Sequence, residues 1–320
     1  MSYGKGKYTY ELAKWQAKYQ EGHTPIEVNS ICIDAKDRLY AFNTGDQPVT
    51  VFDREGNLVK SWGDNLIGHS HGTFVGPDGS IYCADDGNHT VSKFSADGKV
   101  LLTLGTKDKP SDTGFSWVTE TGARRDFMEA LTSTKRGGPP FNAPTGVALN
   151  AKGEIFVADG YGNARVHKFS PEGKLLLSWG EPGKGPGQFI VPHSVAIDKK
   201  GRVLVADRHN NRIQIFDQNG KYLTEWGGLN LPTSLYIDKD DTVYVAELMP
   251  RVTILDNEGK VLAQWGNEGR TKEDPLFVAL HSVVADSKGD LYVAEVMGIF
   301  KDNPFLATRT TRMIQKFTRK

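Results

Sequence analysis

The sequence predicts an all-β fold, specifically a six-bladed β-propeller built from four-stranded blades. Two observations carry this prediction. A pattern of four short strands recurs along the chain, and its first strand begins six times while its fourth strand ends only five times. Self-similarity of this kind is typical of repeat architectures. Radial repetition of small sheets leaves only short, protected edges, which favours a closed propeller over an open array with two exposed edges.

The first strand of each unit is an apolar segment that leads into an Asp-x-x-Gly turn, as in VPHSVAIDKKG at 191–201. We use the term lead residue for the aligned position near the beginning of this strand. A second strand follows and ends in Val-Ala-Asp or a close variant, as at 203–207. The six lead residues are Asn29, His71, Thr145, His193, Thr233 and His281.

The third strand resembles RIQIF at 212–216, and the fourth strand usually ends in Trp-Gly. The last unit stops after its third strand, RMIQKFTRK at 312–320, and therefore lacks a fourth. The N-terminal segment YTYELAKWQ at 8–16 has the pattern of an unpaired fourth strand, with Trp15 in the tryptophan position. We therefore expect residues 1–20 to supply the outer strand of the last blade. Residues 1–320 would then form one closed domain.

Composition excludes several classes of partner. The net charge of +0 gives no electrostatic footprint for nucleic acid or an anionic membrane. No apolar run approaches the roughly 20 residues of a membrane span, and the N-terminus lacks the apolar region of a signal peptide. Cys32 and Cys83 lie in apolar strand patterns and are expected as buried thiols. These features predict a cytoplasmic protein with a small-molecule substrate, and they do not determine the oligomeric state.

Histidine occupies the lead position of alternate units: His71, His193 and His281 lie in the second, fourth and sixth. Alternate blades of a six-fold ring are about one third of a turn apart, so three imidazoles would converge at one level. Three protein ligands with an open face are the arrangement of catalytic zinc. We predict a divalent metal here, with zinc preferred and iron, manganese and copper left open. A lone histidine would more often cap a strand. If the strand register slips, His69 replaces His71.

The loops between second and third strands emerge on the same face as the lead residues. Their recurring acids, such as Asp159 and Asp207, are expected to bond loop amides and to pair with Arg165 or Arg212. Tyr161 and Arg208 lie just beyond these acids. We assign both as catalytic, because a phenol can exchange a proton and a guanidinium can bind a carboxylate or an oxyanion. The residues assigned to substrate binding are Thr44, Asp86, His209 and Met297.

Two insertions break the period of the repeat, at 106–142 and 298–312. Topology directs both to the face of the lead histidines, where long insertions are more often functional than structural. We expect them to form a cap over the site. Its candidate residues are Arg124, Arg125, Phe127, Phe300, Phe305 and Arg309.

The segments FVADGYGNARVHKFSPEGKLLLSWG, GPGQFIVPHSVAI and VADRHNNRIQIF resemble NHL-repeat propellers. In particular they resemble the peptidyl-α-hydroxyglycine α-amidating lyase family. The resemblance implies that His71, His193 and His281 bind catalytic zinc. It also implies that Tyr161 and Arg208 are the active-site tyrosine and arginine. The family reaction splits the N–C bond of an N-(α-hydroxyalkyl) amide into an amide and glyoxylate.

The chain departs from the family at two positions with consequences for function. Thr44 stands where the family has a further active-site arginine, and Ser282 replaces an acidic residue that helps to bind structural calcium. We therefore expect the same metal to act on a different small substrate in a carbinolamide-cleaving lyase, without structural calcium. The alternatives are a metal-dependent hydrolase such as a lactonase, and a non-catalytic NHL interaction scaffold.

Overall fold

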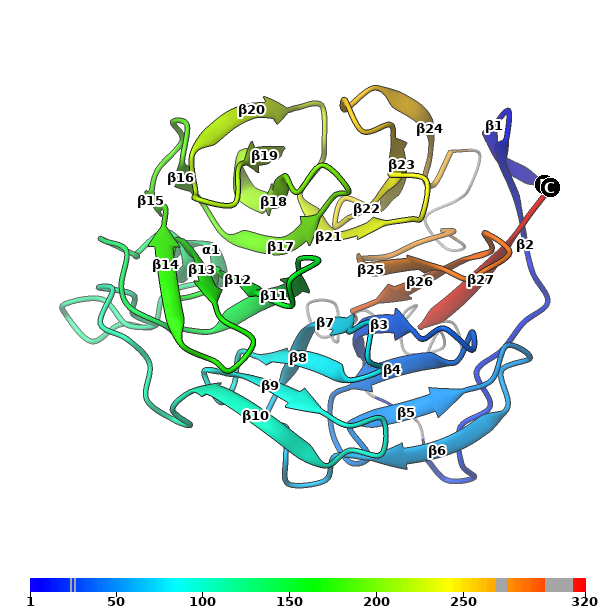
Figure 1. Cartoon of the computed structure of the whole chain (residues 1–320), viewed down its shortest axis with the longest axis horizontal. Helices are drawn as coiled ribbons and strands as arrows, with labels where there is room; N and C mark the ends of the chain where they lie inside the picture. The colour runs from blue at the N-terminus through cyan, green and yellow to red at the C-terminus, as the bar shows by residue number, and fades with distance from the viewer. Residues whose placement is uncertain (24, 26, 269–274, 297–312) are drawn as a thin grey trace. The chain divides into compact units, whose positions relative to one another are not determined.

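The computed structural model describes residues 1–23, 25, 27–268, 275–296 and 313–320. The regular structure of these residues is almost entirely β-strand, with one short helix, α1 (Phe127–Leu131), and one 3-10 turn, η1 (Arg208–Asn210). The strands form six blade sheets, five with four strands and one with five, and a separate two-stranded ribbon (Figure 1). The predicted class, a six-bladed β-propeller of four-stranded blades, is confirmed. No described helix is long and apolar enough to cross a bilayer.

The chain divides into two compact units of three blades each. The first unit comprises Met1–Ser70, Pro77–Gly79 and Thr233–Lys320, and the second comprises His71–Gly76 and Ser80–Pro232. Within each unit, first strands of neighbouring blades lie against one another, as β11 (Pro144–Leu149) does with β17 (Pro192–Ile197), and β25 (Leu280–Ala285) with β3 (Val28–Ile33).

The second unit holds blades two, three and four, whose strands follow one another in sequence. Their bounds are β7 (Ser70–Val75), β8 (Ile81–Asp85), β9 (Thr90–Phe94), β10 (Val100–Gly105), β11 (Pro144–Leu149), β12 (Ile155–Asp159), β13 (Arg165–Phe169), β14 (Leu175–Trp179), β17 (Pro192–Ile197), β18 (Val203–Asp207), β19 (Arg212–Phe216) and β20 (Tyr222–Trp226). The ribbon strands β15 (Glu181–Pro182) and β16 (Gln188–Phe189) connect blades three and four.

The first unit holds blades five, six and one, and the two ends of the chain meet in blade six. The strand bounds are β21 (Pro232–Ile237), β22 (Val243–Glu247), β23 (Arg251–Leu255), β24 (Val261–Trp265), β25 (Leu280–Ala285), β26 (Leu291–Glu295), β27 (Ile314–Arg319), β1 (Ser2–Lys5), β2 (Tyr8–Leu12), β3 (Val28–Ile33), β4 (Leu39–Asn43), β5 (Val49–Phe52) and β6 (Leu58–Trp62).

The N-terminal strand completes blade six, as predicted. β2 pairs antiparallel with β27, with Tyr10 opposite Arg319 and Leu12 opposite Phe317. β1 then adds a fifth strand to this sheet, which the sequence pattern did not predict. The predicted strand also ends earlier than expected, at Leu12, so Trp15 lies outside it. The Trp15 ring packs against Tyr292 at 5.5 Å between centroids.

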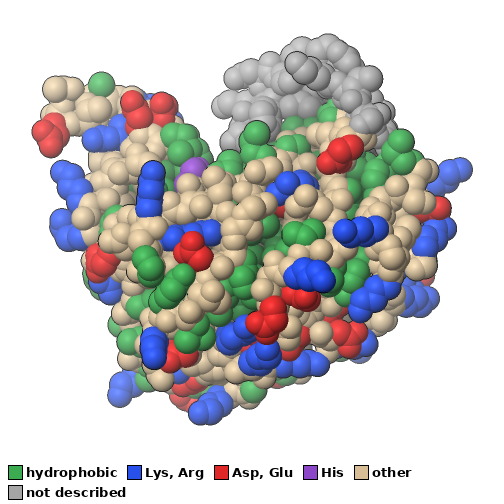
Figure 2. Space-filling view, turned by 90° about the horizontal axis from the view of Figure 1, so that it is seen from above, with side chains coloured by type: hydrophobic (Ala, Val, Ile, Leu, Met, Phe, Trp, Pro, Cys, Tyr) green, Lys and Arg blue, Asp and Glu red, His purple; other side chains and the backbone are tan. Residues whose placement is uncertain are grey.

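Burial follows the order of strands within each blade. The second strand of each blade is buried along its whole length. It lies between two neighbouring strands of its own sheet, and both faces of the sheet are covered there. The outer strands expose about half of their residues and carry polar side chains such as Thr103 and Glu225. Cys32 and Cys83 are buried free thiols, as expected. On the face that Figure 2 shows, basic and acidic side chains are interspersed.

Candidate metal centre and its surroundings

A β-bulge shapes the backbone at the lead positions. In blades one, three, four and six, the pairing of the first strand with the second skips the lead residue. A bulged residue leaves the ladder and its side chain is re-aimed, which is why bulges often lie next to functional sites. The bulged lead residues are Asn29, Thr145, His193 and His281.

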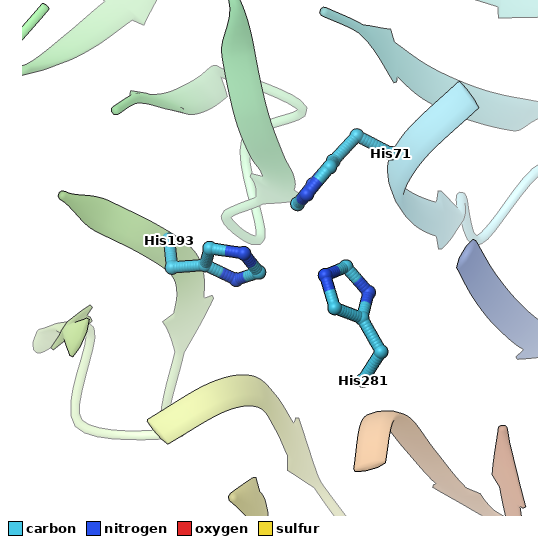
Figure 3. A group of neighbouring side chains, drawn as sticks. All are labelled: His71, His193 and His281. Carbon is cyan, nitrogen blue, oxygen red and sulfur yellow. The ribbon is translucent and has the colours of Figure 1, made fainter. Parts of the chain in front are cut away.

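His71 and His193 lie together in the second unit. Both are buried, at 3% and 1% exposure, and their ring centroids are 4.6 Å apart. The nearest ring nitrogens lie within 4.8 Å of each other, and Figure 3 draws the two rings facing the same space. Nδ1 of His71 donates to the Thr145 carbonyl oxygen at 2.6 Å. This bond fixes the tautomer and leaves a lone pair on Nε2, as in histidines that bind metals.

Tyr161 connects the two imidazoles. Its hydroxyl oxygen lies 3.0 Å from Nε2 of His71 and 3.1 Å from Nε2 of His193. The tyrosine follows β12 and is flanked by glycines. A Cβ at Gly160 would lie 2.1 Å from the Pro192 carbonyl oxygen, so only glycine permits the loop to approach β17 this closely. The structure therefore brings together three of the predicted site residues.

Arg208 is buried beside the same tyrosine, at 2% exposure. Its Nη1 donates to the Tyr161 hydroxyl oxygen at 3.2 Å, and its guanidinium carbon lies 5.1 Å from the centre of the tyrosine ring. Nη2 is buried and has no hydrogen-bond partner among the described residues. A buried cation without full compensation is costly by several kcal/mol. The arrangement therefore favours an anionic ligand at Nη2.

His209 is the next residue and accepts a long hydrogen bond at Nδ1 from Nε of Arg208, at 3.4 Å. Burial and, to a smaller extent, the neighbouring Arg208 cation together lower the pKa of His209 to about 3. The imidazole is consequently neutral at physiological pH. It can offer an uncharged polar surface beside the guanidinium but does not add a positive charge to it.

The other residues assigned to substrate binding lie elsewhere. Asp86 is half-buried in the loop after β8. Thr44 belongs to the first unit, where its hydroxyl donates to Glu27 Oε1 at 3.1 Å and accepts from Asn29 Nδ2 at 3.0 Å. Met297 and the predicted cap segment 298–312 lie outside the described residues. Of these four residues, His209 is the one whose contact with the Tyr161–Arg208 pair is described.

His281 in the first unit has the same support as His71 in the second. It is buried, and its Nδ1 donates to the Asn29 carbonyl oxygen at 2.6 Å, so its Nε2 also keeps a lone pair. The neighbouring Ser282 hydroxyl accepts the backbone N–H of Ile31 at 3.1 Å. Ser282 thus makes a structural hydrogen bond at the position where the amidating lyase family has a carboxylate.

Threonine and asparagine at the alternate lead positions brace the histidine-bearing strands. Each side chain donates to the carbonyl oxygen of the residue that precedes a lead histidine. The pairs are Asn29 Nδ2 to Ser70 at 2.9 Å, Thr145 Oγ1 to Pro192 at 2.6 Å, and Thr233 Oγ1 to Leu280 at 3.0 Å. Sequence reasoning missed this function, although the strict alternation of residue types was its signal.

The recurring loop acids are mainly tied to their own blades, as predicted. Asp207 accepts from Arg212 Nε at 2.9 Å and from the Ile190 amide at 2.8 Å. Asp159 instead accepts from His167, which is fully buried although its sequence position suggests the surface. The expected pairing of Asp159 with Arg165 is wrong: Arg165 bonds Glu181 at 2.6 Å.

The insertion 106–142 reaches the site within the second unit. It contains α1, which begins after Asp126 in a capping box with Glu129. The Phe127 ring at the beginning of this helix lies 6.0 Å from the Tyr161 ring. Arg124 is exposed, and the Arg125 guanidinium donates to the Val118 carbonyl oxygen. Phe127 is therefore the described residue of the predicted cap that contacts the site.

Comparison with known proteins agrees with this picture. The NHL repeat family matches residues 141–169 and 189–216. The peptidyl-alpha-hydroxyglycine alpha-amidating lyase 1 of Drosophila melanogaster is 35% identical over 129 residues, which are 39% of this chain and 19% of that protein. A mouse peptidyl-glycine alpha-amidating monooxygenase is 30% identical over 66% of this chain and 22% of its own length. The chain thus spans about a fifth of the length of these relatives.

Solved structures share the fold at low sequence identity. A gluconolactonase from Xanthomonas campestris has a TM-score of 0.63 and 12% identity, over 97% of this chain and 90% of that one. Virginiamycin B lyase from Staphylococcus aureus has a TM-score of 0.58 and 14% identity, over 89% and 82%. Relatives and structural neighbours therefore include lyases and lactonases on β-propellers.

Proposed function

We propose, from the premise that this chain is an NHL-repeat β-propeller related to amidating lyases, that it is a metal-dependent lyase. Its substrate would be a small carbinolamide-like molecule, an amide whose nitrogen is bonded to a carbon bearing a hydroxyl group, with an anionic group on that carbon. One observation carries the proposal. The Tyr161 hydroxyl lies beside two imidazole nitrogens and a buried guanidinium that has an unpartnered Nη2.

His71, His193 and His281 would hold the metal ion. Three observations support this set: each residue is buried, His71 and His281 carry the same Nδ1 bond to a carbonyl, and all three occupy alternate lead positions. Imidazole is a suitable ligand for zinc, copper, iron and nickel. When bound, such an ion supplies Lewis acidity toward a substrate oxygen.

Tyr161 would transfer the proton of the reaction, and Arg208 would bind the negative charge of the substrate. Tyr161 in its deprotonated form takes the proton of the carbinol hydroxyl, while Arg208 Nη2 holds the anionic group of the substrate. The carbon–oxygen double bond then forms, and the electron pair of the breaking C–N bond stays on the amide nitrogen. Tyr161 returns the proton to this nitrogen, so the products are a free amide and an aldehyde. The Arg208 cation favours negative charge on the tyrosine oxygen during the cycle.

Turnover in ¹⁸O-labelled water tests the reaction class. A lyase yields an amide product whose carbonyl oxygen comes entirely from the substrate, because no water enters the reaction. The amide product is the one to analyse, since aldehydes exchange oxygen with water on their own. Incorporation of solvent oxygen into a carboxylic acid product would overturn the lyase and indicate the hydrolase alternative, for which a lactone panel on the same protein is the direct assay.

A further inference from the structure

The insertion of the second unit exposes two aromatic rings close to the site. Trp117 is 46% exposed and Phe127 is 44% exposed. No other aromatic ring among the described residues belongs to the exposed class. The neighbouring Val118 and Met128 are exposed to a similar degree. Large exposed apolar side chains that gather in one place mark binding surfaces more often than isolated ones do.

Local structure holds these two rings in place. Trp117 and Phe127 lie 6.2 Å apart between centroids, and Phe115 packs edge-on against Trp117 at 5.5 Å. A bridge between Val118 and Arg124 closes the turn that separates them. The Asp126 cap fixes the beginning of α1 and with it the position of Phe127. We refer to Trp117 and Phe127 together as the aromatic shelf.

The aromatic shelf is continuous with the proposed catalytic residues. The Phe127 ring lies 6.0 Å from the Tyr161 ring, at an interplanar angle of 68°. The Tyr161 ring in turn lies 5.0 Å from His71 and 5.5 Å from His193. A ligand bound at Arg208 and Tyr161 could thus extend an apolar group over Phe127 toward Trp117.

We infer that the aromatic shelf binds an apolar, preferably aromatic, acyl group on the amide nitrogen of the substrate. This inference rests on the proposed function, and it narrows the substrate class to small anionic carbinolamides with a hydrophobic acyl group. Two arguments favour this occupant over a protein partner. The shelf consists of two rings and is too small for a stable protein interface, and it is continuous with the site residues. Aromatic pairs also gain from edge-to-face or offset contacts, and the exposed Phe127 ring is accessible to a ligand ring.

Binding of simple carboxylates to the metal-loaded protein tests the aromatic shelf without requiring turnover. The probes are acetate, phenylacetate and phenylbutyrate, measured by calorimetry at constant ionic strength. Phenylbutyrate is long enough to place its ring beyond Tyr161 while its carboxylate remains near Arg208. We expect it to bind at least about tenfold more tightly than acetate, the order of effect of burying one aromatic ring.

Three variants make the test specific. Phe127→Ala and Trp117→Ala should each reduce the ratio of phenylbutyrate to acetate affinity about threefold to tenfold, and Phe127→Leu should retain part of it. Leu176→Ala is the matched control, because this leucine is 46% exposed on β14 of the same unit, and it should leave the ratio unchanged. Near-ultraviolet circular dichroism checks that each variant is folded.

Every outcome bears on the inference. Equal affinities for acetate and phenylbutyrate in the wild type would overturn it, as would a preference that Phe127→Ala and Trp117→Ala both leave intact. A preference that falls in these variants supports the aromatic shelf even if no lyase turnover is found, in which case the proposed function fails alone. Lyase turnover together with an unchanged affinity ratio in both alanine variants would support the proposed function and overturn the aromatic shelf.

Discussion

Blades three and four of the second unit carry different side chains at the same β-bulge. Thr145 and His193 are both bulged lead residues, yet the threonine hydroxyl donates to the Pro192 carbonyl while the histidine presents Nε2 to Tyr161. The bulge thus sets the direction of the side chain, and the residue type decides its task. One lead residue braces the chain, and the next presents a ring nitrogen to the site. The alternation of types around the repeat would produce both a metal site and its support.

Removing one of the three imidazoles should have the largest effect, because it removes a proposed metal ligand. We expect His71→Ala, His193→Ala and His281→Ala each to lower bound metal at least tenfold from about one ion per chain, because a three-ligand site loses a third of its donors. Metal analysis by mass spectrometry on untagged, dialysed protein measures the effect. Full metal content in two of the three variants would contradict the proposed ligand set.

Removing only the Tyr161 hydroxyl should separate chemistry from architecture. Because general acid–base groups typically contribute about a hundredfold to ten-thousandfold, Tyr161→Phe should reduce turnover by that order. Metal content and melting temperature should stay at wild-type values. Tyr222→Phe, on β20 of the same unit, is the control. A merely structural tyrosine would give the reverse pattern, with lower stability and a loss of activity proportional to the loss of folded protein.

Changing a bracing residue should have a smaller effect. Thr145→Val keeps the shape of the side chain but cannot donate to the Pro192 carbonyl, so the strand that carries His193 loses a support. We expect zinc affinity to fall about tenfold, the lower range for partners that orient metal ligands. Titration of the metal-free protein against a chromophoric chelator measures it. Thr145→Ser should restore affinity, and the exposed Thr224→Val should not change it. Unchanged affinity in Thr145→Val would remove the bracing role.

His209 extends the comparison to a half-buried histidine outside the lead positions. Its pKa is lowered to about 3, so the folded protein favours the neutral form. The stability from this preference is complete above the unfolded pKa of about 6.5 and is lost as the pH falls from there toward 3. Between pH 7 and pH 5 the wild type should lose up to about 2 kcal/mol more unfolding free energy than His209→Asn. Parallel losses in urea unfolding would show that His209 does not titrate in this way.

The sequence predicts the fold well because the first-strand pattern of the blade occurs six times along the chain. The count of first and fourth strands even places the N-terminal strand in blade six, where β2 pairs with β27. β1 could not be predicted, since it adds to the outside of a finished blade and has no counterpart in the other five.

The repeat also made some of the candidate site residues predictable from the sequence, whereas others could not be predicted. Alternation predicted that His71 and His193 converge, and position after the loop acid singled out Tyr161 and Arg208; the contacts of the structure bring these residues together. Alternation marked Thr145 as different from the histidines, but its hydrogen bond could not be predicted, because it depends on a bulge and on the distance to a strand in the next blade. The burial of His167 was equally hard to predict, because it depends on Asp159, its partner in the adjacent strand.

The pairing of β2 with β27 also has a consequence for the order of folding. β2 leaves the ribosome well before β27, because about 300 residues of chain lie between the two strands. Each of the other blades can form from consecutive strands, whereas blade six must wait for both partners. Contacts between such distant segments require closure of a long loop and are slow to form. Until then β2 has unpaired backbone groups, and a chaperone that shields short exposed strands would protect the nascent chain at this point.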